Sequence, residues 1–462
     1  MTTITVPLPP RPQVRPPAAW RAPRPEWIRL DQGLTVGAVH LPGQQVAAID
    51  IHLGIDLSAE PDGAEGIAAV MAASLADGSL ERFTGRLAAY GATWDSGVDH
   101  TGPHLACQVP VAYLAPVIEL IAHALREVEL NPADIAQQIQ VLTAQLTLTD
   151  PAGYAARRLA GSVFSPSERA GRPASGTSET LAQLSPEYVA DFHHDHLTAA
   201  GVTIVIAGDL SGIDLEPLVT DAFGTWRTPG GHAPFPRSVP AERSPIVQFG
   251  GHPGAVQCHL MLAVPTISRQ HPDWPALAVA THILGAPLTG RLDAHLREAR
   301  GYTYSTTATL YPLRPSHSVF LINGAFDPAA TVHALDDLRQ ILCTAHQDGF
   351  NTTECSTAGD QLRSSLPLLY ERASIVAAHT RDLAIHGLGD DFTTRTVEAI
   401  QTLTPEDIST AFRRHINLGR LSIVAAGDPH VQAPLADYLS ANPIGSRPGE
   451  TLAVGGDPHP TR

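Results

Sequence analysis

An internal repeat constrains the fold of this 462-residue chain more than any local motif does. Residues 184–210, LSPEYVADFHHDHLTAAGVTIVIAGDL, align without a gap on residues 403–429, LTPEDISTAFRRHINLGRLSIVAAGDP. The two copies share nine identities, which in the first copy are Leu184, Pro186, Glu187, His196, Ile204, Val205, Ala207, Gly208 and Asp209. A segment repeated at a long, fixed spacing indicates a duplicated structural unit.

Each copy has the same local signals. Ser185 or Thr404 stands at a helix N-cap position with Pro at the first helical position, and a β-branched strand ending in Gly-Asp follows. Periodicity predicts the same order of elements in the rest of each half. The predicted segments are strands at 46–55, 104–110, 257–264 and 317–324, and helices at 64–76, 114–128, 273–284 and 331–346.

We therefore expect an α+β fold of two tandem homologous domains, each a mixed β-sheet packed with helices. A Pro- and Gly-rich segment between the repeats, TPGGHAPFPRSVPAERSP, is typical of a linker. The predicted organisation is a Pro/Arg-rich tail at 1–26, a first domain at 27–227, a linker at 228–245, a second domain at 246–440 and a tail at 441–462.

Charge and composition exclude several classes of function. The formal net charge of −16, from 30 basic and 46 acidic residues, disfavours a nucleic-acid partner, and no apolar run is long enough to span a membrane. The four cysteines form no CxxC pair, so a reducing cytoplasm is the expected location. We also find no phosphate-binding loop, no dinucleotide-binding fingerprint and no GxSxG nucleophile elbow.

Two further stretches carry a resemblance to a known family. Residues 65–79, EGIAAVMAASLADGS, form a chemically blank apolar helix that begins with Gly-Ile-Ala, and residues 291–305 read RLDAHLREARGYTYS. Together with the tandem α+β domains and the paired Gly-Asp strand ends, they resemble the pitrilysin/insulinase-type, mitochondrial-processing-peptidase-like metallopeptidases. The resemblance extends over nearly the whole chain.

The resemblance implies a zinc site that this chain has lost. In active members the first-domain helix carries H-x-x-E-H, in which the two His bind zinc and the Glu activates water. Aligned on Gly-Ile-Ala, the histidine positions hold Ala69 and Ala73, and the Glu position holds Ala72. The downstream metal-binding Glu corresponds to Gln145, and an amide is a poorer zinc ligand than a carboxylate. We expect no metal in this chain.

The second-domain motif is retained. In the family an Arg and a Tyr seven residues apart hold the substrate backbone and stabilise the tetrahedral oxyanion, and they correspond here to Arg297 and Tyr304. Guanidinium and phenol groups donate hydrogen bonds to developing negative charge. Gly301 would allow the left-handed turn between a helix carrying Arg297 and a strand carrying Tyr304.

A chain with the Arg/Tyr pair and no zinc ligands resembles the non-metal subunit of a two-chain zinc endopeptidase. The resemblance implies a homologous partner that bears H-x-x-E-H and zinc. Arg297 and Tyr304 would act on that partner's zinc site, and the substrate would be an extended peptide, such as a leader peptide, added to a sheet edge. Alone, the chain would be inactive.

Two alternatives remain open at this stage. The chain could be a catalytically dead scaffold whose role is assembly, although a pure scaffold has no chemical reason to keep Arg297 and Tyr304. It could also be a hydrolase with another metal site. Candidate ligands for that site are His100 with His104, or the cluster of His193, His194, Asp195 and His196.

Overall fold

The computed structural model describes residues 20–77, 81–127, 130–148, 150–226 and 242–442. Most of the predicted tails and linker lies outside these ranges. Within the predicted N-terminal tail, the ring of Trp20 packs against Tyr370 with centroids 5.0 Å apart, and the first strand begins at Glu26.

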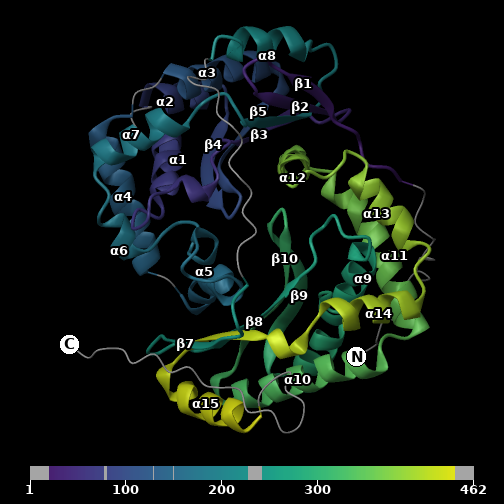
Figure 1. The fold of residues 1–462 in the computed structure, drawn as a ribbon. Helices are drawn as coiled ribbons and strands as arrows, with labels where there is room; N and C mark the ends of the chain where they lie inside the picture. Colours follow the sequence, from purple (N-terminus) through teal and green to yellow (C-terminus); the bar gives the residue numbers. More distant parts are fainter. Residues whose placement is uncertain (1–19, 78–80, 128–129, 149, 227–241, 443–462) are drawn as a thin grey trace, which may run out of the picture.

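The first half contains a six-stranded sheet in the order β1-β2-β6-β3-β5-β4 (Figure 1). Its strands are β1 (Glu26–Arg29), β2 (Thr35–His40), β3 (Val46–His52), β4 (Thr93–Asp99), β5 (Gly102–Pro110) and β6 (Thr203–Gly208). Its helices are α1 (Ile67–Asp77), α2 (Glu81–Ala89), α3 (Leu114–Glu127), α4 (Pro132–Thr147), α5 (Pro151–Val163), α6 (Ser178–Leu181), α7 (Pro186–His196) and α8 (Leu215–Phe223).

The second half contains a five-stranded sheet in the order β7-β11-β8-β10-β9. Its strands are β7 (Val247–Gly251), β8 (Cys258–Thr266), β9 (Thr303–Arg314), β10 (His317–Phe326) and β11 (Ser422–Gly427). Its helices are α9 (Trp274–Gly285), the π-helix η4 (Asp293–Ala299), α10 (Thr331–Asp348), α11 (Thr352–Leu369), α12 (Ala373–Ile385), α13 (Phe392–Ile400), α14 (Pro405–His415) and α15 (Gln432–Ala441).

The two halves have one topology, which confirms the duplicated α+β fold predicted from the repeat. The order β2-β6-β3-β5-β4 matches β7-β11-β8-β10-β9, and each half pairs its first matched strand in parallel with its last. Ser185 and Thr404 cap α7 and α14, as predicted, by accepting hydrogen bonds from backbone amides of the first turn. The strands and helices predicted from periodicity are also present, with ends shifted by a few residues.

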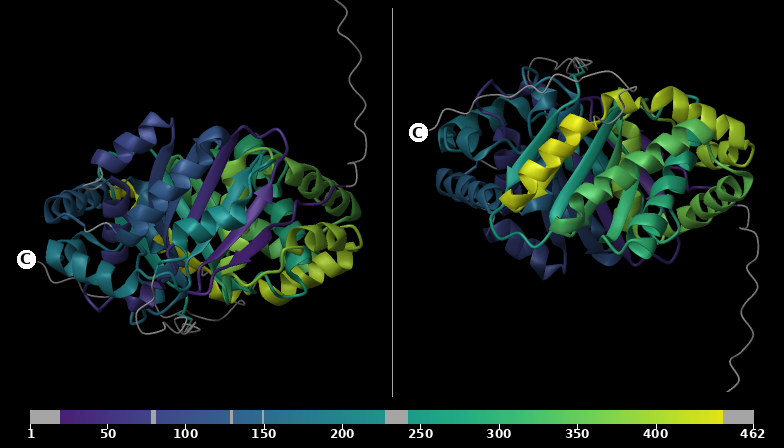
Figure 2. Two further views of the ribbon diagram at one scale, coloured as in Figure 1. Left: turned by 90° about the horizontal axis from the view of Figure 1, so that it is seen from above. Right: turned by 90° about the horizontal axis from the view of Figure 1, so that it is seen from below.

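Successive side chains of a strand point to opposite faces of the sheet, and here apolar side chains are buried on both faces. In β6, Ile204 and Ile206 point into the main core of the first half, whereas Val205 and Ala207 point to the opposite face. Sheets covered on both faces need two layers of helix, because each apolar face must be removed from water. On the outer side of the second sheet, α10 and α15 cover the strands (Figure 2).

Each half supplies the helix that covers the other half's second face. Helix α12 packs on β3 and β6 of the first sheet, and α5 packs on β8 and β11 of the second sheet (Figure 1). The contacts are apolar: α12 contributes Val376 and Ala377, and α5 contributes Ala155 and Leu159. Because both exchanged helices are buried in the opposite half, the two halves form one body.

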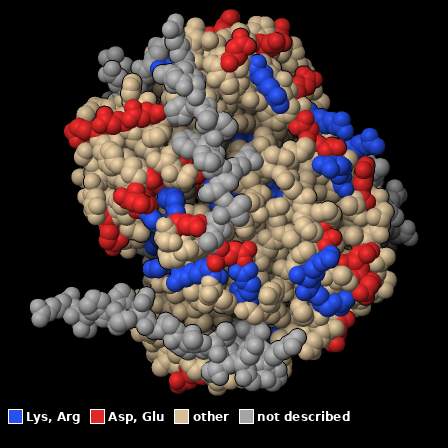
Figure 3. Space-filling model, in the orientation of Figure 1, with Lys and Arg blue, Asp and Glu red and all other residues tan. Residues whose placement is uncertain are grey.

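Ion pairs reinforce this connection. Arg381 on α12 lies 2.9 Å from Asp50 on β3, and both residues are buried. Arg314, at the end of β9, donates to Asp56 in the first half at 2.8 Å. On the face drawn in Figure 3, positive and negative side chains are interspersed over the surface.

Candidate functional site

Helix α1 begins on a buried, charged cap. The backbone amides of Gly66 and Ala68 donate to the carboxylate of Glu60 at 3.1–3.3 Å, and Arg169 pairs with the same carboxylate at 2.6 Å. A negative charge at a helix N-terminus satisfies free amides and interacts favourably with the helix dipole. Burial nevertheless raises the pKa of Glu60 above its ordinary value.

Gly66 permits this tight start to the helix. Its φ of +97° lies in the left-handed region, and a Cβ atom there would stand 2.6 Å from the carbonyl oxygen of Ser175. The glycine that begins the family-like motif is therefore required by the backbone.

The three positions that the resemblance aligns with the zinc-binding histidines and the general base carry only methyl groups here. Ala69 and Ala73, one turn apart on α1, are each 7% exposed, and Ala72 is fully buried in the main core of the first half. Helix α1 packs against α4, α7 and the strands β4 and β5. A methyl group has no lone pair, so none of these three side chains can bind a metal or activate water.

Gln145 lies on α4, the helix that packs beside α1. Its side chain is exposed, whereas Gln138, two turns earlier on the same helix, is buried. The correspondence of Gln145 with the family's downstream Glu stays a prediction.

Arg297 lies on an unusual helix. The segment Asp293–Ala299 is a π-helix. π-Helices are rare in proteins, and those that occur often lie at functional sites. Gly301, with a φ of +68°, turns the chain into β9, as predicted. Buried Asp293 organises the surroundings: its carboxylate accepts from the amides of Leu288 and Thr306 and lies 3.9 Å from Arg297.

Arg297 and Tyr304 both face solvent. The side chain of Arg297 is 35% exposed, and Tyr304, at the start of β9, is 87% exposed. Their elements belong to the second half, and α1 belongs to the first, so the two predicted parts of the site lie in different cores. Whether they act on a common substrate stays a prediction.

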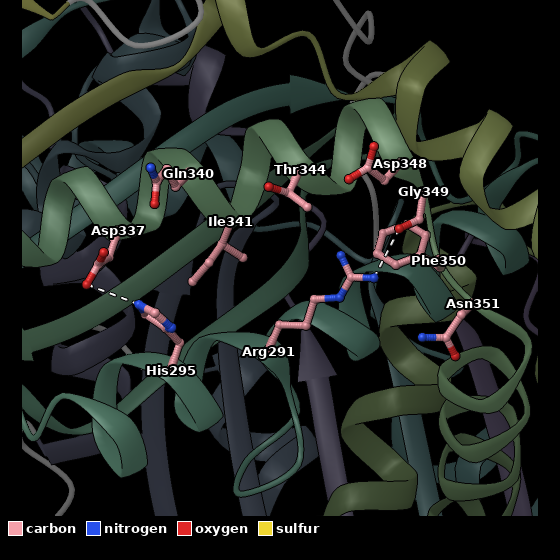
Figure 4. A pocket seen from close by; sticks show the side chains of 10 residues that line it. All are labelled: Arg291, His295, Asp337, Gln340, Ile341, Thr344, Asp348, Gly349, Phe350 and Asn351. Atoms are coloured by element: carbon pink, nitrogen blue, oxygen red, sulfur yellow. Dashed lines mark hydrogen bonds and ion pairs between the residues drawn. The ribbon is translucent and has the colours of Figure 1, made fainter.

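A pocket of about 500 Å³ lies behind the π-helix, between η4 and α10 (Figure 4). His295 and Arg300 of the π-helix segment both pair with Asp337 on α10, at 3.1 and 3.2 Å. Arg291 pairs with Glu354 and donates to the carbonyl of Gly349. These contacts anchor the segment that carries Arg297. Arg297 and Tyr304 do not line the pocket.

The two motifs also lie beside sheet edges. Strand β4 is an edge of the first sheet and packs against α1, and strand β9 is an edge of the second sheet and packs against η4. An edge strand has unpaired backbone amides and carbonyls on one side, which an extended peptide can use.

The alternative histidine sites predicted from the sequence do not assemble a ligand set. Over the described ranges, the one group of three or more His, Cys, Asp or Glu donors with ligand atoms within 4.8 Å is His271, Asp273 and His415. His415 matches His196 in the internal repeat, but Asp273 and His271 come from a segment 142 residues away, so no local pattern joined them. No motif in the sequence indicates this group.

Burial also governs the other candidate histidines. It lowers the pKa values of His100 and His193 to about 4, so both rings are neutral at pH 7. His104 lies 3.9 Å from Asp99 across the β4–β5 hairpin, and burial lowers its pKa as well. Among the described residues, no helix is both long and apolar enough to cross a membrane.

Comparisons with known proteins agree with the family predicted from the sequence. Residues 183–362 match the family model described as the peptidase M16 inactive domain. An uncharacterised zinc protease of Mycobacterium leprae is 24% identical over 360 residues, which cover 73% of this chain and 77% of that protein.

Solved structures share the fold. A peptidase M16 inactive domain from Pseudomonas fluorescens superposes with a TM-score of 0.77 at 20% identity, covering 87% of this chain and 98% of that one. A chain of complex III2 from Candida albicans superposes with a TM-score of 0.73 at 16% identity, covering 87% and 95%. The family-model match of residues 183–362 confirms the resemblance to the pitrilysin/insulinase-type peptidases, and the solved structures show that the fold is shared.

Proposed function

We propose that this chain is the zinc-free subunit of a two-chain zinc endopeptidase, in which a homologous partner carries H-x-x-E-H and the zinc. The observation that carries the proposal is the contrast between the two motifs. Helix α1 keeps its buried Glu60 cap and its Gly66 turn but has alanine at positions 69, 72 and 73, whereas Arg297 and Tyr304 remain as exposed donors.

The exposure of Tyr304 favours a role in binding another molecule. A phenol that is 87% exposed contributes little to folding, and neighbouring Arg297 makes only a partly exposed contact at 3.9 Å. Both groups can therefore reorient toward a substrate carbonyl. The backbone beneath them is fixed, because the π-helix that carries Arg297 is anchored through Asp337 and Asp293. Asp293 also binds the amide of Thr306, two residues after Tyr304. Only the two side chains would need to move when the substrate binds.

The substrate of such a pair would be an extended peptide. Strand β9, which begins at Thr303, offers a free edge next to Tyr304, and main-chain pairing with it would bring a peptide carbonyl toward the two donors. A leader segment of a ribosomally made peptide is one substrate of this kind, and the cytoplasm is the compartment we propose.

The test is coexpression with a homologue from the same genome that carries H-x-x-E-H. We expect the two chains to elute as one complex and to cleave unfolded peptides, and each chain alone to be inactive. Arg297→Ala and Tyr304→Phe should each lower turnover by about 10²–10³-fold, the usual effect of removing an oxyanion donor. Complex formation should be unchanged.

Matched controls separate this role from a general surface effect. Arg395→Ala and Tyr188→Phe change the same residue types at exposed positions on α13 and α7 and should leave turnover unchanged. Peptide cleavage by the isolated chain would refute the proposal. A stable complex whose turnover is insensitive to both donor substitutions would instead favour the scaffold role, for which the fold shared with a chain of complex III2 is the supporting observation.

A further inference from the structure

Three side chains that the proposed function does not use meet where α9 begins and α14 ends. His271 and Asp273 directly precede α9, and His415 is the last residue of α14. We infer that His271, Asp273 and His415 form a binding site for a divalent transition-metal ion of the zinc class. The inference is independent of the proposed peptidase role.

The three donor atoms lie within 4.8 Å of one another, and two of their distances bracket the spacing that a tetrahedral ion requires. Nε2 of His415 lies 2.7 Å from Oδ2 of Asp273, and Nδ1 of His271 lies 4.0 Å from the same oxygen. Zinc bonds of about 2.0–2.2 Å place tetrahedral ligand atoms about 3.3 Å apart. The two observed distances lie on either side of that value, so a small rotation of the carboxylate away from His415 and toward His271 would equalise them.

Each imidazole has a nitrogen beside the carboxylate of Asp273. The backbone amide of Asp273 donates to Nδ1 of His271 at 3.0 Å, so Nδ1 is the acceptor nitrogen and the ring proton is on Nε2. Nε2 of His415 shares a proton with the carboxylate of Asp273. A metal ion would replace that proton, and the ring of His271 would turn so that the lone pair of Nδ1 leaves the amide of residue 273 and points to the ion.

The local charges permit a cation. Asp273 is the one acidic side chain of the group, and its carboxylate lies against both imidazoles. The C-terminal end of α14 carries a partial negative charge, which offsets the partial positive charge at the N-terminal end of α9. Arg414 opposes binding, since its guanidinium lies 3.6 Å from Asp273, but its side chain is 70% exposed and can move into solvent.

The donor set selects the metal. Two imidazoles and one carboxylate suit zinc, cobalt and nickel better than calcium or magnesium, which prefer all-oxygen ligands. Three protein ligands leave one position for water. A bound ion would also join α9 to α14, which already pack together, so metal should stabilise the second half against unfolding.

Equilibrium dialysis of the purified full chain against zinc, and separately against cobalt(II), tests the inference. We expect one equivalent of either metal, visible cobalt absorption bands, and a rise in the thermal midpoint that a chelator reverses. His271→Asn and His415→Gln should each weaken binding at least tenfold. Both variants should fold, because Asn can still accept from the amide of residue 273 and Gln can still donate to Asp273.

The matched control is His194→Asn, an exposed histidine in the separate cluster on α7. This variant should bind metal as the unaltered chain does. Loss of binding in it, or binding that survives both His271→Asn and His415→Gln, would place the metal elsewhere. Absence of cobalt bands and of retained zinc in the unaltered chain would show that the three residues form only an ion-pair cluster, whatever the outcome of the peptidase test.

Discussion

Replacing Arg381 with methionine should destabilise the whole chain. The guanidinium of Arg381 comes from α12 in the second half, and its partner Asp50 lies on β3, in the middle of the first sheet. Arg381 is 8% exposed and Asp50 is 7% exposed. Methionine keeps most of the apolar stem, so the change chiefly removes the charge and leaves the carboxylate buried without its partner.

The magnitude follows from the desolvation of Asp50. Removing one member of a buried ion pair typically costs about 3–5 kcal/mol. With a urea dependence of about 3 kcal/mol/M, this corresponds to a fall of about 1 M or more in the unfolding midpoint. The native pair is itself imperfect, because the facing atoms, Oδ1 of Asp50 and NH1 of Arg381, make no hydrogen bond. The double variant Asp50→Val with Arg381→Met should therefore recover most of the loss.

The loss should also depend on pH. Burial raises the pKa of Asp50, with Arg381 opposing that shift. A carboxyl whose pKa is higher in the folded than in the unfolded state weakens folding as pH rises through that range. Without Arg381 the pKa rises further, so the deficit of Arg381→Met should be larger at pH 8 than at pH 5.

Urea unfolding of the three proteins at both pH values checks this reasoning. Arg395→Met, which breaks an exposed pair with Asp391, is the control and should change stability by about 0.5 kcal/mol or less. A loss below about 1 kcal/mol in Arg381→Met, or a double variant no more stable than the single one, would refute the account of the buried pair.

Two further outcomes are expected. Gly66→Ala should destabilise the chain by about 1–3 kcal/mol because alanine is strained at a positive φ, and by a further amount because its Cβ would contact Ser175. Gly63 also has a positive φ, +85°, but has open space around its Cβ position, so Gly63→Ala should show only the backbone strain. Thermal unfolding of the two variants measures the difference. Burial lowers the pKa of His52 to about 4, so its contribution to the free energy of unfolding is present above pH 6.5 and is lost as pH falls toward 4, by about 3 kcal/mol in all. His52→Gln should remove this part of the pH dependence of stability. An unchanged dependence of stability on pH in this variant would contradict the lowered pKa of His52.

Much of the fold could be predicted because its signals are local. The capped helices that begin after Ser185 and Thr404, and the buried strands that end in Gly-Asp, depend on residues within a few positions of one another. Helix α1, predicted at residues 64–76, was found for the same reason. Its starting residue in the structure is Ile67, three residues later than periodicity suggested, because Gly66 forms the turn that precedes the helix.

The candidate site was less predictable. Family resemblance gave positions 69, 72, 73, 145, 297 and 304, but it did not indicate that Arg297 lies on a π-helix held by Asp293 and Asp337. Neither carboxylate stands out in the sequence, because an aspartate in a helical segment is usually a solvated surface residue. Their roles depend on burial and on partners from other elements.

The amino-acid sequence by itself determined that this chain folds as two copies of one α+β unit and that positions 69, 72 and 73 carry no side chain able to bind a metal, since duplication and side-chain chemistry can be recognised without coordinates. Tertiary structure alone decided that α5 and α12 are exchanged between the halves, that Arg381 meets Asp50, and that His271 and Asp273 meet His415. The physical reason is that these contacts join residues far apart in the chain. Their proximity comes from burying the second face of each sheet, which no local periodicity encodes.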